Sequence, residues 1–323
     1  MRSMCRTVLV AAITVLAAGS LQAQTWPSKP VKMINAFGAG SAPDIVSRVM
    51  ADRLSRALSQ QVVVENRPGS GGIVAAQAVA RAPADGYTFF FATTAPLITS
   101  RLTFKSLPYD AAKDFAPVAM VGRNPFLILI NPELPVKTLP DLVAYERMHA
   151  GQMSFATDGP RNFSGMVGAW LNKVARTEFV QVPYANIGQG IQDTIAGRTQ
   201  GIILAFAAAR QFMASGKLKA IAKTGPEKIP GFEPMPQVAD AYPGFLFAGW
   251  FAIVAAAGTP SDIVLRMNRE IDKVLQDPEV VQKLDEMGVS TNGADTPEGF
   301  GRFMRAEDER WEKIVREIGI EPE

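Results

Sequence analysis

Apolar and polar positions along the first third of the chain alternate between two periods. Short runs of β-branched and aromatic residues predict strands, and the segments between them repeat apolar residues at helical spacing. The expected strands are 31–37, 62–65 and 87–91, and the expected helices are 45–58 and 73–81. Strands that alternate with helices predict an α/β fold with a largely parallel sheet.

The same alternation resumes further along the chain. Helices are expected at 139–149, 163–174 and 188–196, and strands at 153–157, 179–183 and 201–206. The C-terminal third lacks strand-like runs after residue 257 and predicts three helices, at 261–276, 278–287 and 297–318. This second α/β set indicates a second lobe.

Two long apolar runs interrupt the pattern, at 118–130 and 247–257. The first has the pattern of two strands joined by an irregular break, and the second resembles a return crossing. They predict two α/β lobes with a ligand cleft between them, since clefts between domains are preferred ligand sites. Lobe 1 would comprise 24–122 and 250–323, and lobe 2 would comprise 123–249. A single large doubly wound sheet is the alternative.

The N-terminus has the pattern of a secretory signal peptide. Arg2 and Arg6 precede an apolar stretch at 8–18, and small residues follow up to Ala23. The stretch is too short to span a bilayer comfortably. We therefore expect residues 1–23 to be removed on export to the periplasm; a retained N-terminal helix is the alternative. Cys5 would be lost with them, so the mature chain would have no disulfide.

Charge and composition exclude several kinds of chemistry. Without Arg2 and Arg6 the mature chain has equal numbers of basic and acidic residues, which gives no field for nucleic acid. His149, at a helix end, is the only histidine, so a His/Cys metal cluster is impossible. There is no Gly-x-Ser-x-Gly motif. We expect no cofactor, no metal and no enzymatic activity.

A glycine-containing loop between the first strand and helix is the strongest candidate site. It runs Phe37, Gly38, Ala39, Gly40 and Ser41. Ser41 and Asp44 have the spacing of a capping box. Free N–H groups of Gly38, Gly40 and Ser41 at the helix N-terminus would bind a carboxylate or a phosphate. The alternative is a well-capped turn with no ligand.

The same loop is a near match to a dinucleotide-binding motif. Gly38 and Gly40 have the required spacing, and Glu65 ends the next strand, where a ribose acceptor would lie. Pro43 replaces the last glycine, and export argues against a nicotinamide cofactor. The second glycine-rich loop, 66–72, lacks the Lys-Ser/Thr ending of a P-loop and is interpreted as a tight strand–helix connection.

A second candidate loop links strand 153–157 to the following helix. It contains Thr157, Asp158, Gly159, Arg161, Asn162 and Phe163. Asn162 or Ser164 could cap the helix and leave N–H groups facing the cleft. Arg161 could hold a carboxylate with two parallel hydrogen bonds, or it could simply be solvated.

Nearly the whole mature chain resembles the substrate-binding proteins of tripartite tricarboxylate transporters, the Bug family. The resemblance rests on an ordered set of motifs: WPSKPV at 26–31, the 37–44 loop, VVVENRPGSGG at 62–72, ADGYT at 84–88, LPYD at 107–110, KDFAPV at 113–118, VPY at 182–184, GKLKA at 216–220 and AGTP at 257–260.

The resemblance implies a type II periplasmic binding protein fold, a carboxylate ligand, and delivery of that ligand to membrane permease subunits by a monomer. To the two loops above, the expected ligand-binding set adds Thr93, Thr94, Ala205 and Phe206. This chain departs from the family where two prolines are usual, at Gly38 and Ala39. Strand 201–206 also lacks the family's acidic residue. The missing acid favours an apolar or aromatic carboxylate, or a dicarboxylate, over an amino acid.

Two other functions remain as alternatives at this point. A ligand sensor for a membrane signalling protein would need the same closing cleft. A dinucleotide-dependent enzyme ranks below both binding functions.

Overall fold

The computed structural model describes residues 26–184, 186–229 and 231–322. Across these residues, strands of two half-sheets form one continuous path of hydrogen-bonded neighbours. The strands are β1 (Val31–Asn35), β2 (Val62–Asn66), β3 (Thr88–Thr93), β4 (Phe115–Ile130), β5 (Ser154–Thr157), β6 (Val180–Pro183), β7 (Gly201–Ala205), β8 (Lys219–Lys223) and β9 (Ala248–Ala256).

Helices cover both half-sheets. They are α2 (Ala42–Leu58), α3 (Ile73–Ala80), α4 (Ser100–Thr103), α5 (Leu139–Met148), α6 (Phe163–Ala175), α7 (Ile187–Ile195), α8 (Phe206–Ala214), α9 (Val238–Ala241), α10 (Ser261–Gln276), α11 (Pro278–Glu286) and α12 (Pro297–Ile318). A 3₁₀ turn, η1 (Ser70–Gly72), precedes α3, and a π-helical segment, η2 (Ala95–Thr99), leads into α4. The predicted α/β class is confirmed, and no helix of the described residues is long and apolar enough to cross a membrane.

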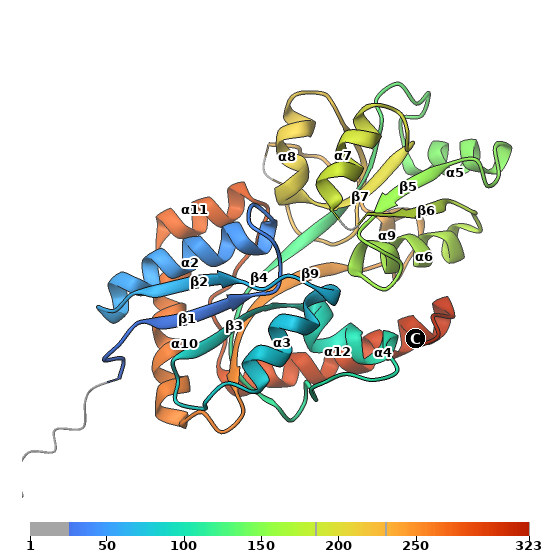
Figure 1. Cartoon of the computed structure of the whole chain (residues 1–323). Coiled ribbons are helices and arrows are strands. Elements are labelled where there is room, and N and C mark those ends of the chain that lie inside the picture. The colour runs from blue at the N-terminus through green and yellow to red at the C-terminus, as the bar shows by residue number, and fades with distance from the viewer. Residues whose placement is uncertain (1–25, 185, 230, 323) are drawn as a thin grey trace, which may run out of the picture.

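The strand order divides the molecule into two lobes. In lobe 1, β1 pairs in parallel with β2 and β3, and β9 lies antiparallel between β3 and β4. In lobe 2, β5 pairs in parallel with β6 and β7. Figure 1 shows the two groups of helices on either side of a middle region crossed by β4 and β9. The residue limits 24–122 with 250–323, and 123–249, stay a prediction.

Strand β4 connects the lobes. From Phe115 to Pro125 it pairs with β9, and from Phe126 to Ile130 it pairs with β7 and β8. The prediction of two strands joined by an irregular break was wrong, because β4 is a single continuous strand. Its irregularity is a pair of register shifts against β9, between Pro117 and Ala119 and between Met120 and Gly122. Such bulges bend a strand without ending it.

The core follows the period of the strands. In β3 the Phe90 ring faces one hydrophobic cluster, while Phe89 and Phe91 face another on the opposite side of the sheet. Burial on both faces explains why this strand is a continuous apolar run. A third cluster around Phe206 fills lobe 2.

The structure differs from the predicted elements near the site. Helix α8, which borders the outer cleft, was not predicted, and Phe206 begins it rather than ending β7. Strand β8 was not predicted either. His149 ends α5, as expected, where it stacks on Tyr145 with ring centroids 4.2 Å apart. The expected signal peptide, 1–23, lies outside the described residues.

Candidate functional site

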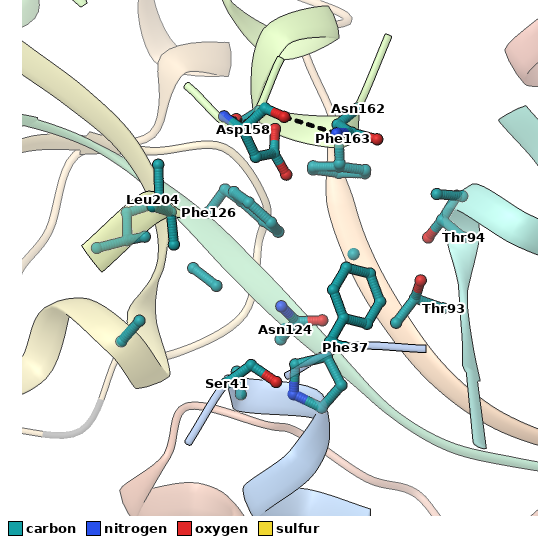
Figure 2. Close-up of a pocket in the computed structure, with 18 of the residues that line it drawn as sticks. Phe37, Ser41, Thr93, Thr94, Asn124, Phe126, Asp158, Asn162, Phe163 and Leu204 are labelled. Atoms are coloured by element: carbon teal, nitrogen blue, oxygen red, sulfur yellow. Dashed lines mark hydrogen bonds between the residues drawn. The ribbon is translucent and has the colours of Figure 1, made fainter. Parts of the chain in front are cut away.

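A cavity lies between the lobes, where β1 and β3 end and β4 crosses. Its inner part has a volume of about 170 Å³ and continues into an outer cleft of about 1120 Å³. Phe37, Ser41, Asp158 and Asn162 border both parts. Figure 2 shows side chains from both lobes directed into the inner cavity. The ends of parallel strands at such a crossing are a common ligand position in α/β folds.

Aromatic and aliphatic side chains form most of the inner wall. Phe126 of β4 and Phe163 of α6 lie with ring centroids 4.5 Å apart, and Phe163 packs in turn on Trp311 of α12. The other apolar wall residues come from both lobes: Phe37, Pro43, Ile187, Ile203, Leu204, Ala205, Trp250 and Phe251. This wall suits a ligand with an apolar body.

Three polar atoms on the inner wall are buried without a hydrogen-bond partner in the described chain. They are Thr93 Oγ1, Thr94 Oγ1 and Asn124 Oδ1. Thr94 and Asn124 are only 2% and 4% exposed. A buried polar group left unpaired costs about 1–3 kcal/mol, so its presence needs an explanation. Two hydroxyls and one amide facing a cavity are ready to bind a polar ligand group.

Asp158 adds a charge to the opposite wall. It follows β5, its Oδ1 accepts a hydrogen bond from the Ser164 hydroxyl, and its carbonyl accepts one from Asn162 Nδ2 at 2.6 Å. Figure 2 shows its carboxyl group pointing toward the space near Phe126 and Phe163. Burial raises the pKa of Asp158 to about 6, against the opposing effect of hydrogen bonds from Ser164 and the first turn of α6.

The glycine loop differs from the predicted anion site. The Gly40 N–H donates to Asp44 Oδ2 at 2.9 Å, and the Ser41 N–H donates to the Gly38 carbonyl. Those two amides are already hydrogen-bonded within the loop, which argues against their binding a carboxylate, and the site expected there stays a prediction. Ser41 does cap α2, since its hydroxyl accepts from the Asp44 N–H. Gly38, Ala39 and Gly40 border the outer cleft and not the inner cavity.

A buried network holds this loop on the sheet. The Asp44 side chain is 4% exposed and pairs with Arg48 at 2.9 Å. Asn66 Nδ2 donates both to Asp44 Oδ1 at 2.8 Å and to the Phe37 carbonyl at 2.7 Å. Burial acts to raise the pKa of Asp44, but the hydrogen bonds and charge of Arg48, with the Gly40 amide and Asn66, lower it overall. The loop is therefore fixed before any ligand arrives.

The second glycine-rich loop also contributes to the cleft. Pro68, Gly69, Ser70 and Gly71 border its outer part, although the sequence suggested only a tight connection. A Cβ atom at Gly71 would lie 2.9 Å from Asn162 Oδ1, so this lobe 1 loop nearly touches the lobe 2 loop. The run of glycines was the available signal. Glu65, the expected ribose acceptor, is paired with Arg67 instead.

Several predicted residues are not brought to the cavity. Arg161 donates to the carbonyls of Thr103, at 3.1 Å, and Glu321, at 3.3 Å, and it borders neither part of the cleft. These contacts hold Arg161 away from both parts of the cleft, and its expected carboxylate grip stays a prediction. Thr157 is fully buried, and Gly159 turns the chain with a φ of 118°. Phe206 packs on Phe232 in the lobe 2 core, with ring centroids 5.8 Å apart.

Other wall residues were not predicted. Asn124, Phe126 and Trp250 come from the two long apolar runs, which the sequence presented only as crossings. The polar Asn124 inside an apolar run was a usable signal. No Lys, Arg or His is among the residues bordering the inner cavity, and no metal-binding group of His, Cys, Asp or Glu occurs in the described residues.

Two α/β lobes with a ligand-sized cavity at their crossing define the class of periplasmic solute-binding receptors. The family model described as "Tripartite tricarboxylate transporter family receptor" matches residues 46–320. The chain belongs to this family. It is 32% identical to Protein BugT of Bordetella pertussis over 98% of both chains.

Solved structures confirm the fold. An R. palustris protein solved with adipate has a TM-score of 0.87 and 31% identity, and the match covers 92% of this chain and 100% of that one. The periplasmic binding protein BugD has a TM-score of 0.84 and 25% identity, with 92% and 100% covered. The expected type II periplasmic binding fold is thus confirmed. Proteins of this family are solute-binding receptors and not enzymes.

Proposed function

We propose that this protein is a periplasmic receptor for a small carboxylate with an apolar or aromatic body. Its lobes close on the ligand, and it delivers the ligand to the permease subunits of a tripartite membrane transporter. The observation that carries the proposal is the pair of unpartnered hydroxyls of Thr93 and Thr94 on a mostly apolar wall.

The chemistry of Thr93, Thr94 and Asn124 fits a carboxylate. The Thr93 and Thr94 hydroxyls can each donate a hydrogen bond, and an ionised carboxylate has only acceptors. The unpartnered atom of Asn124 is Oδ1, an acceptor, so Asn124 can donate to a carboxylate only through its Nδ2 group. Hydrogen bonds to a charged group are stronger than neutral ones, at about 1.5–3 kcal/mol each. Donors without a full positive charge can hold the carboxylate and still release it to a transporter.

The ligand body is set by the aromatic wall. Burying apolar surface contributes roughly 25 cal/mol per Å². The rings of Phe126 and Phe163 form one continuous surface beside the polar group. The related R. palustris protein was solved with adipate, a carboxylate with an apolar middle.

Calorimetry on the chain from residue 24 onward tests the binding function. Benzoate and adipate are expected to bind, and aspartate is expected to bind more weakly than at least one of them. The double variant Thr94→Val with Asn124→Leu is expected to lose at least about tenfold in affinity, since two charge-assisted hydrogen bonds are removed. Tight binding of aspartate alone, or no loss in the double variant, would contradict the proposal.

Transport is tested separately in cells. Deleting the gene for this chain is expected to abolish uptake of the labelled ligand, and restoring it is expected to recover uptake. Normal uptake with a lost transcriptional response to the ligand would instead indicate a sensor. Size-exclusion chromatography with light scattering checks the prediction of a monomer.

A further inference from the structure

Asp158 is the only charged side chain bordering the inner cavity, among the residues the structure describes. A receptor for anions would be expected to place a cation there. Instead a carboxylate faces a wall of aromatic rings, with Thr93 at the end of β3 and Thr94 directly after it on another part of the wall. Two parts of the cavity are therefore chemically different: one offers the Thr93 and Thr94 hydroxyls as donors and the other offers the Asp158 carboxylate as an acceptor.

Within the part of the chain that the structure describes, no Lys, Arg or His borders the inner cavity beside Asp158. The Asp158 Oδ1 accepts a hydrogen bond from the Ser164 hydroxyl at the start of α6. On its own loop, Arg161 is engaged by the carbonyls of Thr103 and Glu321.

The ionisable groups of the neighbouring elements are also engaged or more distant. The Tyr184 hydroxyl, after β6, donates to Asp193 at 2.7 Å. On α2, Asp44 is paired with Arg48. Arg210 of α8 borders the outer cleft, as Asp158 also does, but not the inner cavity.

Building on the carboxylate function proposed above, we propose that Asp158 selects a ligand whose far end carries a hydrogen-bond donor. The ligand is then a monocarboxylate with an apolar or aromatic body and a hydroxyl or ammonium group opposite the carboxylate. A second carboxylate at that end is disfavoured.

The physical reason is the balance of donors and acceptors. An ionised carboxylate can only accept hydrogen bonds, so a hydroxyl or ammonium pairs with Asp158 and a second carboxylate does not. Like charges repel more strongly beside an apolar wall than in bulk water, and the rings of Phe126 and Phe163 form such a wall. A dicarboxylate is therefore expected to bind more weakly, and sharing a proton with Asp158 would reduce the repulsion.

The acid that strand β7 lacks is therefore supplied from the β5–α6 loop. The sequence argued against an ammonium ligand because 201–206 carries no acidic residue. In the structure Asp158 provides a partner for a donor in the same cavity that Leu204 and Ala205 of β7 line. Ligand selection then depends on the group that the ligand carries opposite its own carboxylate, and not on an acidic residue in β7.

A matched series of three ligands tests the proposal by calorimetry at pH 8. Benzoate, 4-hydroxybenzoate and terephthalate share one ring and differ only in the group opposite the carboxylate. The wild-type chain from residue 24 is expected to bind 4-hydroxybenzoate about tenfold more tightly than benzoate, and terephthalate more weakly than benzoate. In Asp158→Asn the preference for 4-hydroxybenzoate over terephthalate is expected to fall by at least about tenfold.

Two further measurements keep the test decisive. With wild-type protein, lowering the pH from about 8 to 5.5 is expected to strengthen terephthalate binding and weaken 4-hydroxybenzoate binding, because Asp158 takes up a proton. This shift should be absent in Asp158→Asn. Ser164→Ala removes a hydrogen bond to Asp158 but keeps its charge, and it is expected to keep the wild-type ligand order.

Each result has one meaning. If terephthalate binds wild type more tightly than 4-hydroxybenzoate at pH 8, the proposal is overturned while the carboxylate function stands. An unchanged ligand order in Asp158→Asn, with only a changed melting temperature, would show that Asp158 serves the structure of α6 alone. If wild type binds none of the three acids, nor adipate, the carboxylate function itself fails.

Discussion

The backbone N–H of Gly40 donates a hydrogen bond to the side-chain carboxylate of Asp44, over 2.9 Å. The loop that has the sequence pattern of an anion site thus already binds an anion, one supplied by its own helix. Asp44 is buried and is held on its other side by Arg48 and Asn66. The carboxylate serves as an anchor for the loop, which fixes Phe37 and Ser41 at the edge of the cavity.

Replacing that anchor is expected to destabilise the protein. Asp44→Asn removes the charge that pairs with Arg48 and presents an amide to the Gly40 N–H, at a cost of about 2 kcal/mol at neutral pH. Because the folded-state pKa of Asp44 lies below its usual value of 3.8, its contribution is complete above that pH and is lost as the pH falls below it. Thermal unfolding from pH 2.5 to pH 7 measures the difference.

The exposed Asp52 on the same helix is the control. Its side chain is 58% exposed and pairs with Arg56, so Asp52→Asn is expected to change the melting temperature little. If Asp44→Asn is as mild as Asp52→Asn at neutral pH, the network does not anchor the loop.

The sequence predicted an element well where the residues that determine the element lie within its own segment. Helices α10 and α12 were predicted to the residue, because their apolar period and their ends are contained in the segment itself. The run at 118–130 was predicted as two strands, because Asn124 and Pro125 interrupt its apolar pattern. In fact β9 and then β7 pair with it throughout.

The cavity was predicted less well for the same reason. Asn124 reaches the site only because β4 lies beside β9, a contact between distant segments. Arg161 is turned away from the cleft by a carbonyl of Glu321, far along the chain. No local sequence pattern could predict on which side of the loop the Arg161 guanidinium would lie. By contrast Phe37, Asp158 and Asn162 lie in strand–helix loops, and Phe163 begins the helix that follows the second loop. The position of such loops at the sheet edge follows from the fold.

Asp158 is expected to make stability depend on pH in the opposite sense to Asp44. Its pKa of about 6 in the folded protein lies above its usual value of 3.8, so folded protein binds this proton more readily than unfolded chain. Stability should therefore fall as the pH rises from about 4 to 6 and should level off above that range. Asp158→Asn has no such carboxyl group and lacks this loss. The melting temperature of the variant minus that of wild type should therefore increase as the pH rises from about 4 to 7.5.

The same pair of melting curves contains its own check. A constant difference between Asp158→Asn and wild type across this range would mean that the carboxyl group titrates normally. Such a result would also remove the reason for expecting a change of ligand order with pH.

Gly40 and Gly38 are expected to respond differently to an added methyl group. Gly40 has a φ of 80°, a left-handed conformation in which alanine is strained. Gly38 does not have a positive φ. Neither Cβ would meet another atom within 4 Å, so only backbone strain separates the two. Gly40→Ala is expected to cost about 1 kcal/mol and Gly38→Ala less than half of that. Equal costs in chemical denaturation would show that the loop relaxes to another conformation.

Thr94→Val is expected to stabilise the ligand-free protein and to weaken its binding. The Thr94 hydroxyl is buried on the cavity wall without a partner, so a methyl group of similar size removes a desolvation cost of about 1 kcal/mol. The melting temperature should rise. Affinity for benzoate should fall about tenfold, since one charge-assisted hydrogen bond is lost.

Thr99 provides the matched control. Its hydroxyl oxygen is also buried without a partner, in η2, but it does not border the inner cavity. Thr99→Val is therefore expected to raise the melting temperature in the same way and to leave benzoate affinity unchanged. If Thr94→Val binds benzoate as wild type does, its hydroxyl has no part in holding the carboxylate. If both variants lose affinity equally, the loss reflects packing around η2 and not a hydrogen bond to the ligand.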